Sequence, residues 1–202
     1  VPLGVLSAYK EESKLDQSLS GAAQLGLSIP AFVLGLILIF VFAVKLRWLP
    51  ATGWTRISNS VTGNMRTVAL PAISLAVAEA AVYMRVVRSD MIATLQENYI
   101  LAARAKGLKD RFILFRHGLR PSSLTLITLV GLNLAGMIAG TIVIERLFAI
   151  PGLGWRLFGA IFQRDYMMVQ GITVLIAAFY VLVNAVVDFL YMAIDPRIRR
   201  RT

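Results

Sequence analysis

The sequence predicts an all-α polytopic membrane protein with four transmembrane helices, and three observations lead to this fold class. Hydrophobic residues occupy 57% of the 202 positions and charged residues only 16%, whereas soluble domains carry about 25% charged residues. The mean hydropathy is +0.71. The apolar residues are also gathered into long continuous runs, which is typical of membrane-spanning helices.

Four runs are long enough, or nearly so, to cross a hydrocarbon core of roughly 30 Å, which needs about 20 apolar residues. They cover residues 17–44, 67–84, 122–144 and 166–193. The first run is longer than the core, and Ser28-Ile29-Pro30 provides a site for a kink within it. The second run contains Glu79, and the fourth contains Asn184 and Asp188.

The basic residues predict the orientation of these spans. The formal net charge is +10, from 21 Lys and Arg against 11 Asp and Glu. Of the 21 basic residues, 14 fall in the two ends of the chain and in the middle segment 85–121. Since cytoplasmic loops carry an excess of Lys and Arg, we expect both ends and the middle segment in the cytoplasm. Segment 145–165 is then a periplasmic or outer segment.

The rare residue types exclude several kinds of site. The chain has no cysteine and a single histidine, His117, so it cannot form a disulfide, a thiolate site or a cluster of His ligands. It also lacks the Gly-rich sequence of a P-loop. We therefore expect no metal, no cofactor and no ATP site of its own.

The middle segment is the most informative part of the sequence. Ser89-Asp90 predicts the N-terminus of a helix over 91–106, Gly107 its C-terminal stop, and residues 109–117 a second short helix. Tyr99, Ala102, Ala103 and Lys106 then share one face. Two alanines leave a shallow surface that another protein can approach closely. From composition alone, a solvated loop against lipid headgroups is an equal alternative. Nucleic-acid binding is disfavoured because the segment is short and poor in aromatic residues.

The residues of this segment resemble a known motif. Leu101-Ala102-Ala103-Arg104-Ala105-Lys106-Gly107 is similar to the EAA loop of the membrane subunits of ABC importers, with both alanines and the glycine in register. Leu101 replaces the glutamate of the motif. The wider string from Tyr99 to Leu108, followed by Arg116-His117-Gly118-Leu119-Arg120, resembles the peptide/nickel branch of these permeases. Pro121 stands one position later than in that branch.

Further strings resemble the B-type permease subunit of the same branch, so that the resemblance covers nearly the whole chain. They are Leu27–Phe32, Trp48–Gly53, Ile150–Gly154, Arg164–Tyr166, Val169–Gly171 and Asp195–Arg199. Family members usually have six spans. The resemblance implies that this chain is an N-terminally truncated part of one type I permease domain, holding spans three to six, with Val1–Leu6 closing span two.

The resemblance also implies a function and partners. The chain would be a non-enzymatic permease subunit, forming the path for peptides or a related small solute in a bacterial or archaeal inner membrane. Its partners would be a second homologous permease subunit, cytoplasmic ABC ATPase subunits and an extracytoplasmic solute-binding protein. The EAA-like coupling loop, 85–121, would dock the ATPase through Tyr99, Ala102, Ala103, Arg104, Lys106, Gly107, Leu108 and Lys109.

Polar residues within the spans leave alternatives open. A charged Glu79 at the centre of a membrane helix costs about 2.5–3.5 kcal/mol on insertion scales and should face protein or water. It either lines the translocation path or, as we favour, makes an interhelical hydrogen bond or pairs with an arginine. Asn184 and Asp188 lie one turn apart, and we favour structural pairing for them too. An intramembrane enzyme with Glu79 and Asp188 as an acid pair is the alternative that the sequence disfavours, since no nucleophile motif adjoins a base.

The outer segment 145–165 contains an amphipathic pattern. Leu153, Leu157, Ile161 and Phe162 recur at helical spacing and predict a short helix. Two interpretations are equally favoured. The helix contacts a substrate-loaded binding protein at the outer mouth, or it anchors in the membrane interface through Trp155 and Phe158.

Overall fold

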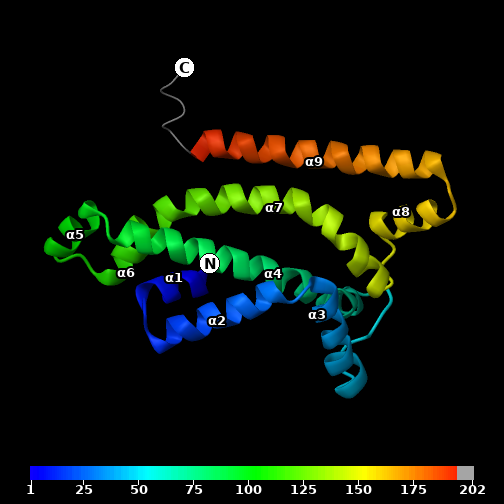
Figure 1. The fold of residues 1–202 in the computed structure, drawn as a ribbon, viewed down its shortest axis with the longest axis horizontal. Helices are drawn as coiled ribbons and strands as arrows, with labels where there is room; N and C mark the ends of the chain where they lie inside the picture. Colours follow the sequence, from blue (N-terminus) through cyan, green and yellow to red (C-terminus); the bar gives the residue numbers. More distant parts are fainter. Residues whose placement is uncertain (195–202) are drawn as a thin grey trace. The chain divides into compact units, whose positions relative to one another are not determined.

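The computed structural model describes residues 1–194, without the side chains at positions 124, 135, 138–140, 188 and 190–194. The described part is helical and contains no β-strand, which confirms the all-α class. The elements are α1 (Pro2–Tyr9), α2 (Lys14–Ser28), α3 (Ala31–Leu38), η1 (Ile39–Lys45), α4 (Val61–Leu95), α5 (Asn98–Ala105), α6 (Asp110–Phe112), η2 (Ile113–Leu119), α7 (Arg120–Leu147), α8 (Leu153–Phe162) and α9 (Tyr166–Ile194) (Figure 1). The short elements η1 and η2 are π-helical.

Two described helices are long and apolar enough to cross a membrane, and a third span is possible as a broken pair. The two are α4 and the stretch Tyr166–Val187 of α9, and the pair is Lys14–Ser28 with Ala31–Lys45. The third predicted span, 122–144, lies in α7, which is helical over 28 residues. Because several of its side chains lie outside the described residues, α7 contributes only the apolar stretch Thr125–Leu134. The described helices therefore give two candidate spans, or three if the broken pair forms one span, and the expected count of four stays a prediction.

The predicted kink at Ser28-Ile29-Pro30 is a complete break. Helix α2 ends at Ser28, and Pro30 adopts an extended conformation (φ −56°, ψ 140°) before α3 begins. Proline lacks an N–H group and disfavours helical geometry in the residue before it. A single apolar run in the sequence therefore becomes two helices.

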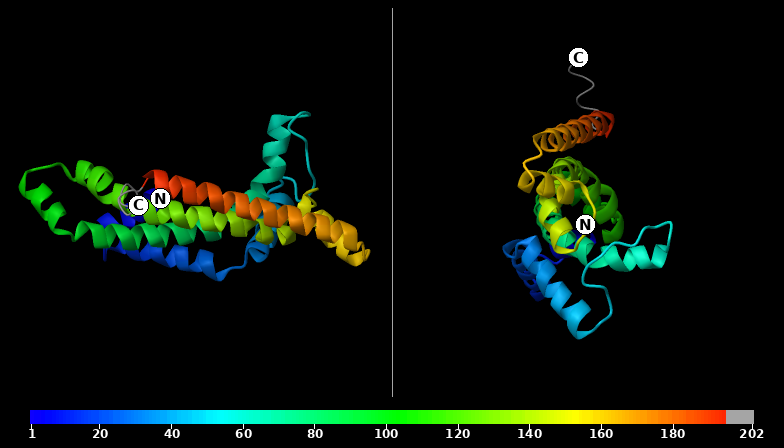
Figure 2. Two further views of the ribbon diagram at one scale, coloured as in Figure 1. Left: turned by 90° about the horizontal axis from the view of Figure 1, so that it is seen from above. Right: turned by 90° about the vertical axis from the view of Figure 1, so that its right-hand side faces the viewer.

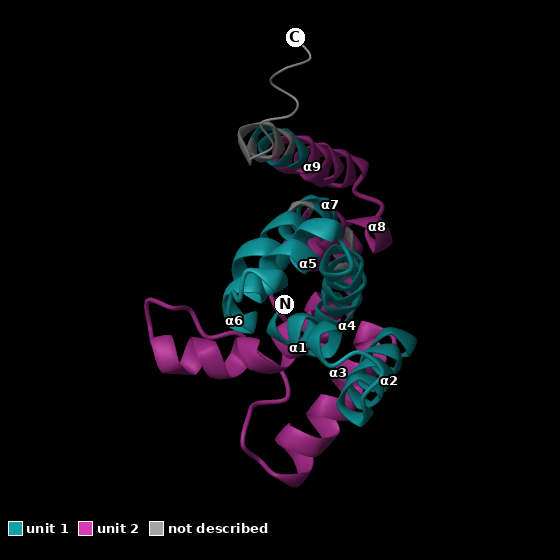
Figure 3. Ribbon diagram, turned by 90° about the vertical axis from the view of Figure 1, so that its left-hand side faces the viewer, with its two compact units in different colours: residues 1–28, 79–133, 184–202 teal, residues 29–78, 134–183 magenta. Residues whose placement is uncertain are grey.

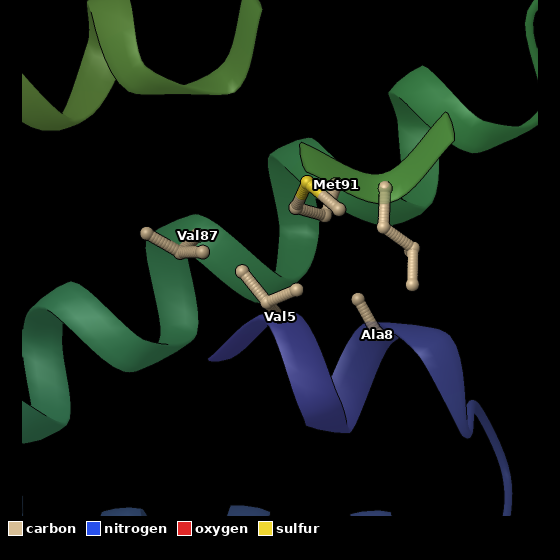
Figure 4. Packing of buried hydrophobic residues seen from close by; sticks show 5 residues of the cluster. Val5, Ala8, Val87 and Met91 are labelled. Carbon is tan, nitrogen blue, oxygen red and sulfur yellow. The ribbon is translucent and has the colours of Figure 1, made fainter. Parts of the chain in front are cut away.

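The chain forms two compact units (Figure 3). Unit 1 contains residues 1–28 and 79–133 and the described part of 184–202. Its main apolar cluster joins α1 to the second half of α4 through Val5, Ala8, Val87 and Met91 (Figure 4). Close approach at this contact depends on Gly4, since a Cβ there would lie 2.7 Å from the Met84 carbonyl oxygen of α4.

Unit 2 contains residues 29–78 and 134–183. Its core is formed by Leu70 of α4 with Ile144 and Phe148 at the end of α7, and side chains of α3 and η1 pack around them. Polar contacts fix the loop between η1 and α4. The Gly53 amide donates to the Phe148 carbonyl, and the Arg66 guanidinium donates to the Trp48 carbonyl at 2.7 Å.

The prediction of a helix start at Ser89-Asp90 is wrong, because α4 continues without interruption to Leu95. Tertiary packing explains the continuation. Val87 and Met91 are fully buried against α1, and Thr94 lies within hydrogen-bond distance of Ser122 at the start of α7 (3.3 Å). The capping preference of Ser and Asp is weaker than this packing.

Candidate functional site

The predicted coupling helix is shorter than expected and corresponds to α5. It begins at Asn98 after the extended residue Glu97, and it lies with α6 beyond the C-terminal end of α4 (Figures 1 and 2). Its inner face carries Ile100 and Ala103, which are 0% and 7% exposed and pack against Ile113 of η2. Helix α5 is thus held to unit 1 by a small apolar cluster of its own.

Gly107 ends α5 as the sequence predicts. Its φ is +74°, in the left-handed region that favours glycine. The Gly107 amide donates to the Arg104 carbonyl, and the Leu108 amide donates to the Ala103 carbonyl. These two bonds form a Schellman motif, which satisfies the last carbonyl groups of the helix. No atom lies within 4 Å of a Cβ built at Gly107, so its backbone conformation, and not lack of space, is what requires glycine.

Tyr99 links α5 to the segment that returns to the membrane. Its hydroxyl donates to the His117 carbonyl oxygen at 3.2 Å, although 45% of the residue is exposed. Burial and the nearby Glu97 carboxylate raise the pKa of the Tyr99 hydroxyl above its usual value. Tyr99 therefore stays neutral, and can donate this bond, throughout the physiological pH range.

Most of the predicted docking residues lie on the outside of this loop, and we name them the α5 surface. Its members are all exposed: Tyr99, Ala102, Arg104, Lys106, Gly107, Leu108 and Lys109. Beside it, Phe112 and Phe115 are half exposed or more and line a depression with Lys109, Arg111 and Arg116. The surface therefore alternates positive charge with apolar area.

Ala103 is buried, unlike the other predicted docking residues. Its side chain packs beneath α5 against Ile100 and Ile113, and it does not share an exposed face with Ala102. Consecutive residues of an α-helix differ by about 100° in direction, which places the two alanines on different faces. The expectation of a common Ala102–Ala103 face is therefore wrong, and only Ala102 supplies the shallow outer surface.

The expected second short helix, 109–117, also differs in extent. Helices α6 and η2 together continue into α7, so the helix does not end at residue 117 as predicted. Gly118 lies inside this continuous helix, and a Cβ there would lie 2.9 Å from the Met91 Cε atom. This glycine serves the close packing of η2 against α4, whereas Gly107 serves a turn.

Glu79 makes the interhelical hydrogen bond that the sequence favoured. The Asn133 side-chain amide of α7 donates to the Glu79 carboxylate of α4 at 2.9 Å. On α9, the Asn184 Oδ1 atom is buried and has no hydrogen-bond partner among the described residues. The Asp188 side chain and the tail arginines lie outside the described residues.

The outer segment contains the short helix α8, as the spacing predicts. Gly154 and Ala160 form its buried side, whereas Leu153, Ile161 and Phe162 are exposed. A preceding pair of charged residues fixes its start. The Trp155 amide donates to the Glu145 carboxylate at 2.8 Å, which satisfies a free N–H group of the first helical turn. The Arg146 guanidinium stacks on the Trp155 and Phe158 rings, 4.3 and 4.4 Å from their centroids.

Among the described residues, no group of three His, Cys, Asp or Glu side chains could hold a metal ion. The polar contacts that connect helices include a partly buried ion pair between Asp16 and Arg88, the Glu79–Asn133 contact and the capped start of α8. The arrangement is that of a helical membrane body with one exposed basic loop.

A family model for the binding-protein-dependent transport system inner membrane component matches residues 1–200. The chain belongs to this family. The match includes the α5 surface, the Glu79–Asn133 contact and α8. It confirms the resemblance drawn from the EAA-like loop, and it identifies the chain as a membrane component of a transport system.

Several curated relatives are similar to almost the whole chain. A probable peptide ABC transporter permease protein, y4tP of Sinorhizobium fredii, is 39% identical over 199 residues, which are 98% of this chain and 64% of that protein. The oligopeptide transport system permease proteins AppB of Bacillus subtilis and OppB of Salmonella typhimurium are 41% and 40% identical over 98% of this chain and 63% of their own lengths. The chain thus spans slightly less than two thirds of these relatives.

Sequence reasoning missed the residues that connect α2 to α4. Asp16 lies just before an apolar run and Arg88 just after another, and nothing in their spacing of 72 residues indicates that they pair. Asn133 was also missed. Its signal is visible, because an amide within an otherwise apolar membrane run needs a hydrogen-bond partner.

Proposed function

We propose that this family member is a permease subunit of an ATP-driven importer, and that it helps to form the membrane path for peptides. The names of the similar proteins support the substrate class. The other subunits would be a second permease, cytoplasmic ABC ATPases and an extracytoplasmic binding protein. The membrane would be the inner membrane of a bacterium or archaeon, with both ends of this chain in the cytoplasm.

The observation that carries the coupling role is the combination of an exposed α5 surface with a rigid attachment. Ala102 leaves a shallow site bordered by basic residues, and the Schellman motif at Gly107 fixes the end of the helix. Ile100 and Ala103 join α5 to η2, which continues directly into α7. A force applied to α5 by an ATPase would therefore reach a membrane helix through packed side chains.

The Glu79–Asn133 contact supports a structural role for Glu79 in this proposal. A carboxylate that already accepts an amide hydrogen bond is partly satisfied within the protein. Glu79 is only partly buried, so contact with a passing solute is a separate proposal that transport measurements can decide.

The experiment that tests the proposal is co-purification with cognate ABC ATPase subunits. Ala102→Asp places a carboxylate on the α5 surface and should abolish co-purification and peptide uptake. Docking of the ATPase would remove this new charge from water, which costs free energy. Ala93→Asp is the matched control, since Ala93 is an exposed alanine on α4 outside the α5 surface. Normal uptake in Ala102→Asp, with equal amounts of protein in the membrane, would contradict the assignment.

A further inference from the structure

A groove in unit 1 lies between α2 and the second half of α4. Its volume is about 610 Å³, and its lining includes Ser20, Gln24 and Leu27 from α2 and Val82, Arg85 and Ser89 from α4. Neither the transport path nor the α5 surface accounts for it. The groove is larger than the depression beside Phe112 and more polar than the clusters that surround it.

The two helices run in opposite directions along this groove, so its character changes from one end to the other. At one end Arg88 of α4 pairs with Asp16 of α2. At the other end Leu27 packs near Ala81 and Met84. Hydroxyl, amide and guanidinium groups therefore lie toward the first end, and the Leu27 and Val82 side chains lie toward the second.

Arg85 supplies the unpaired charge of the groove. Arg88 already donates two hydrogen bonds to Asp16, both at 2.7 Å, which compensates its charge. Arg85 is exposed, and its one side-chain contact is with the Gln24 carbonyl oxygen at 3.4 Å. No carboxylate of the described residues pairs with it. The polar end thus offers a guanidinium, an amide and hydroxyl groups, which are all able to donate to an anion.

We propose that this groove binds the phosphate headgroup of an anionic phospholipid, with Arg85 as its main contact. Helix α4 is a candidate membrane span, and Val82 belongs to the run 67–84 that the sequence places in the membrane. An acyl chain can lie along Leu27 and Val82 while the phosphate reaches Arg85. Basic sites between helices at the cytoplasmic side are typical of lipid-headgroup recognition. A bound peptide fits less well, because its polar backbone would meet apolar side chains at that end.

Native mass spectrometry of the purified protein with added phosphatidylglycerol or phosphatidylcholine tests this proposal. We expect phosphatidylglycerol to bind more tightly, and Arg85→Gln to weaken its binding about tenfold through loss of a charge-assisted contact. Gln24→Glu should weaken it similarly, because the new carboxylate pairs with Arg85. Arg85→Lys should retain most of the binding, which shows that a loss in Arg85→Gln is not caused by misfolding. Arg56→Gln, which removes an exposed arginine of unit 2, should bind as the wild type does.

Four results would overturn the proposal. They are equal affinity of the wild type for the two lipids, unchanged binding in both Arg85→Gln and Gln24→Glu, an equal loss in Arg56→Gln, and displacement of the lipid by a competitor. Inorganic phosphate that displaces phosphatidylglycerol at equal concentration would indicate a site for free anions. Trialanine that does so would indicate a site for peptide carboxylates.

Discussion

Asp16 and Arg88 form a two-pronged ion pair between α2 and α4, although 72 residues separate them in the chain. The Arg88 Nε and Nη2 atoms donate to the two carboxylate oxygens of Asp16, both at 2.7 Å. Asp16 also accepts hydrogen bonds from the buried Ser7 hydroxyl and from the Glu12 amide. The carboxylate therefore fixes α1, the following turn and α2 against one point of α4.

This geometry predicts unequal effects of removing the two partners. The Asp16 side chain is 4% exposed and that of Arg88 is 29% exposed. Arg88→Met leaves a buried carboxylate without its cation, and we expect a loss of about 3–5 kcal/mol in the free energy of unfolding. Asp16→Asn leaves a guanidinium that water can reach, and we expect a smaller loss of about 1–3 kcal/mol. Equilibrium unfolding in detergent micelles measures both values.

The order of the two losses is the decisive result. Arg66→Met provides a control, because Arg66 is an exposed arginine of α4 that binds a single backbone carbonyl. We expect it to cost less than Arg88→Met. If Asp16→Asn cost more than Arg88→Met, the burial of the carboxylate would not govern the stability of this contact.

Replacement of Gly107 should destabilise the turn that ends α5. Gly107→Ala forces a Cβ into the left-handed region, at a cost of about 1–2 kcal/mol. Gly107→Asn should cost less, because asparagine tolerates this conformation. The amides of Gly107 and Leu108 should exchange with deuterium faster in Gly107→Ala, since both donate the hydrogen bonds of the Schellman motif. Hydrogen exchange followed by mass spectrometry checks this.

The matched control for this change is Gly159→Ala in α8. Gly159 is helical, and no atom lies within 4 Å of a Cβ placed on it. Alanine there should be neutral or stabilise the helix by about 0.5–1 kcal/mol. Equal exchange of the Leu108 amide in Gly107→Ala and in the wild type would show that the turn does not depend on glycine.

The hydrogen bond between Asn133 and Glu79 should contribute a modest coupling energy to the stability of the folded protein. In a double-mutant cycle with Glu79→Ala and Asn133→Ala, we expect about 0.6 kcal/mol and at most about 1.7 kcal/mol, the range of hydrogen bonds within membrane bundles. Glu79→Gln keeps a carbonyl acceptor for the Asn133 amide and should leave stability nearly unchanged. Peptide uptake by Glu79→Gln then separates the two roles. Normal uptake supports a structural role, and a selective loss of uptake supports a place on the path.

The sequence predicts the helical class, the membrane runs and the end of α5 because local rules govern them. Gly107 ends a helix by its own conformational freedom, and Pro30 interrupts one by its ring. The start predicted at Ser89-Asp90 failed because burial of Val87 and Met91 against α1 outweighs a local capping preference. Such a contact between distant segments leaves no pattern around residue 89.

The site residues divide in the same way. The resemblance to the EAA loop predicts the residues of the α5 surface, but it does not distinguish the exposed Ala102 from the buried Ala103. That distinction depends on Ile113, which reaches α5 only after the chain has turned at Gly107. The partner of Glu79 likewise lies 54 residues away on α7. Spacing within one helix cannot supply either contact.

The distribution of basic residues predicts which side of the membrane each loop occupies, and the absence of cysteine makes this testable. Lys109→Cys and Gln163→Cys each place one thiol at an exposed position, beside α5 and after α8. In intact cells that lack the partner subunits, a membrane-impermeant maleimide should label Gln163→Cys. It should label Lys109→Cys only after the membrane is permeabilised, since a loop rich in Lys and Arg stays in the cytoplasm. Labelling of Lys109→Cys in intact cells would reverse the orientation and would remove the α5 surface from the reach of a cytoplasmic ATPase.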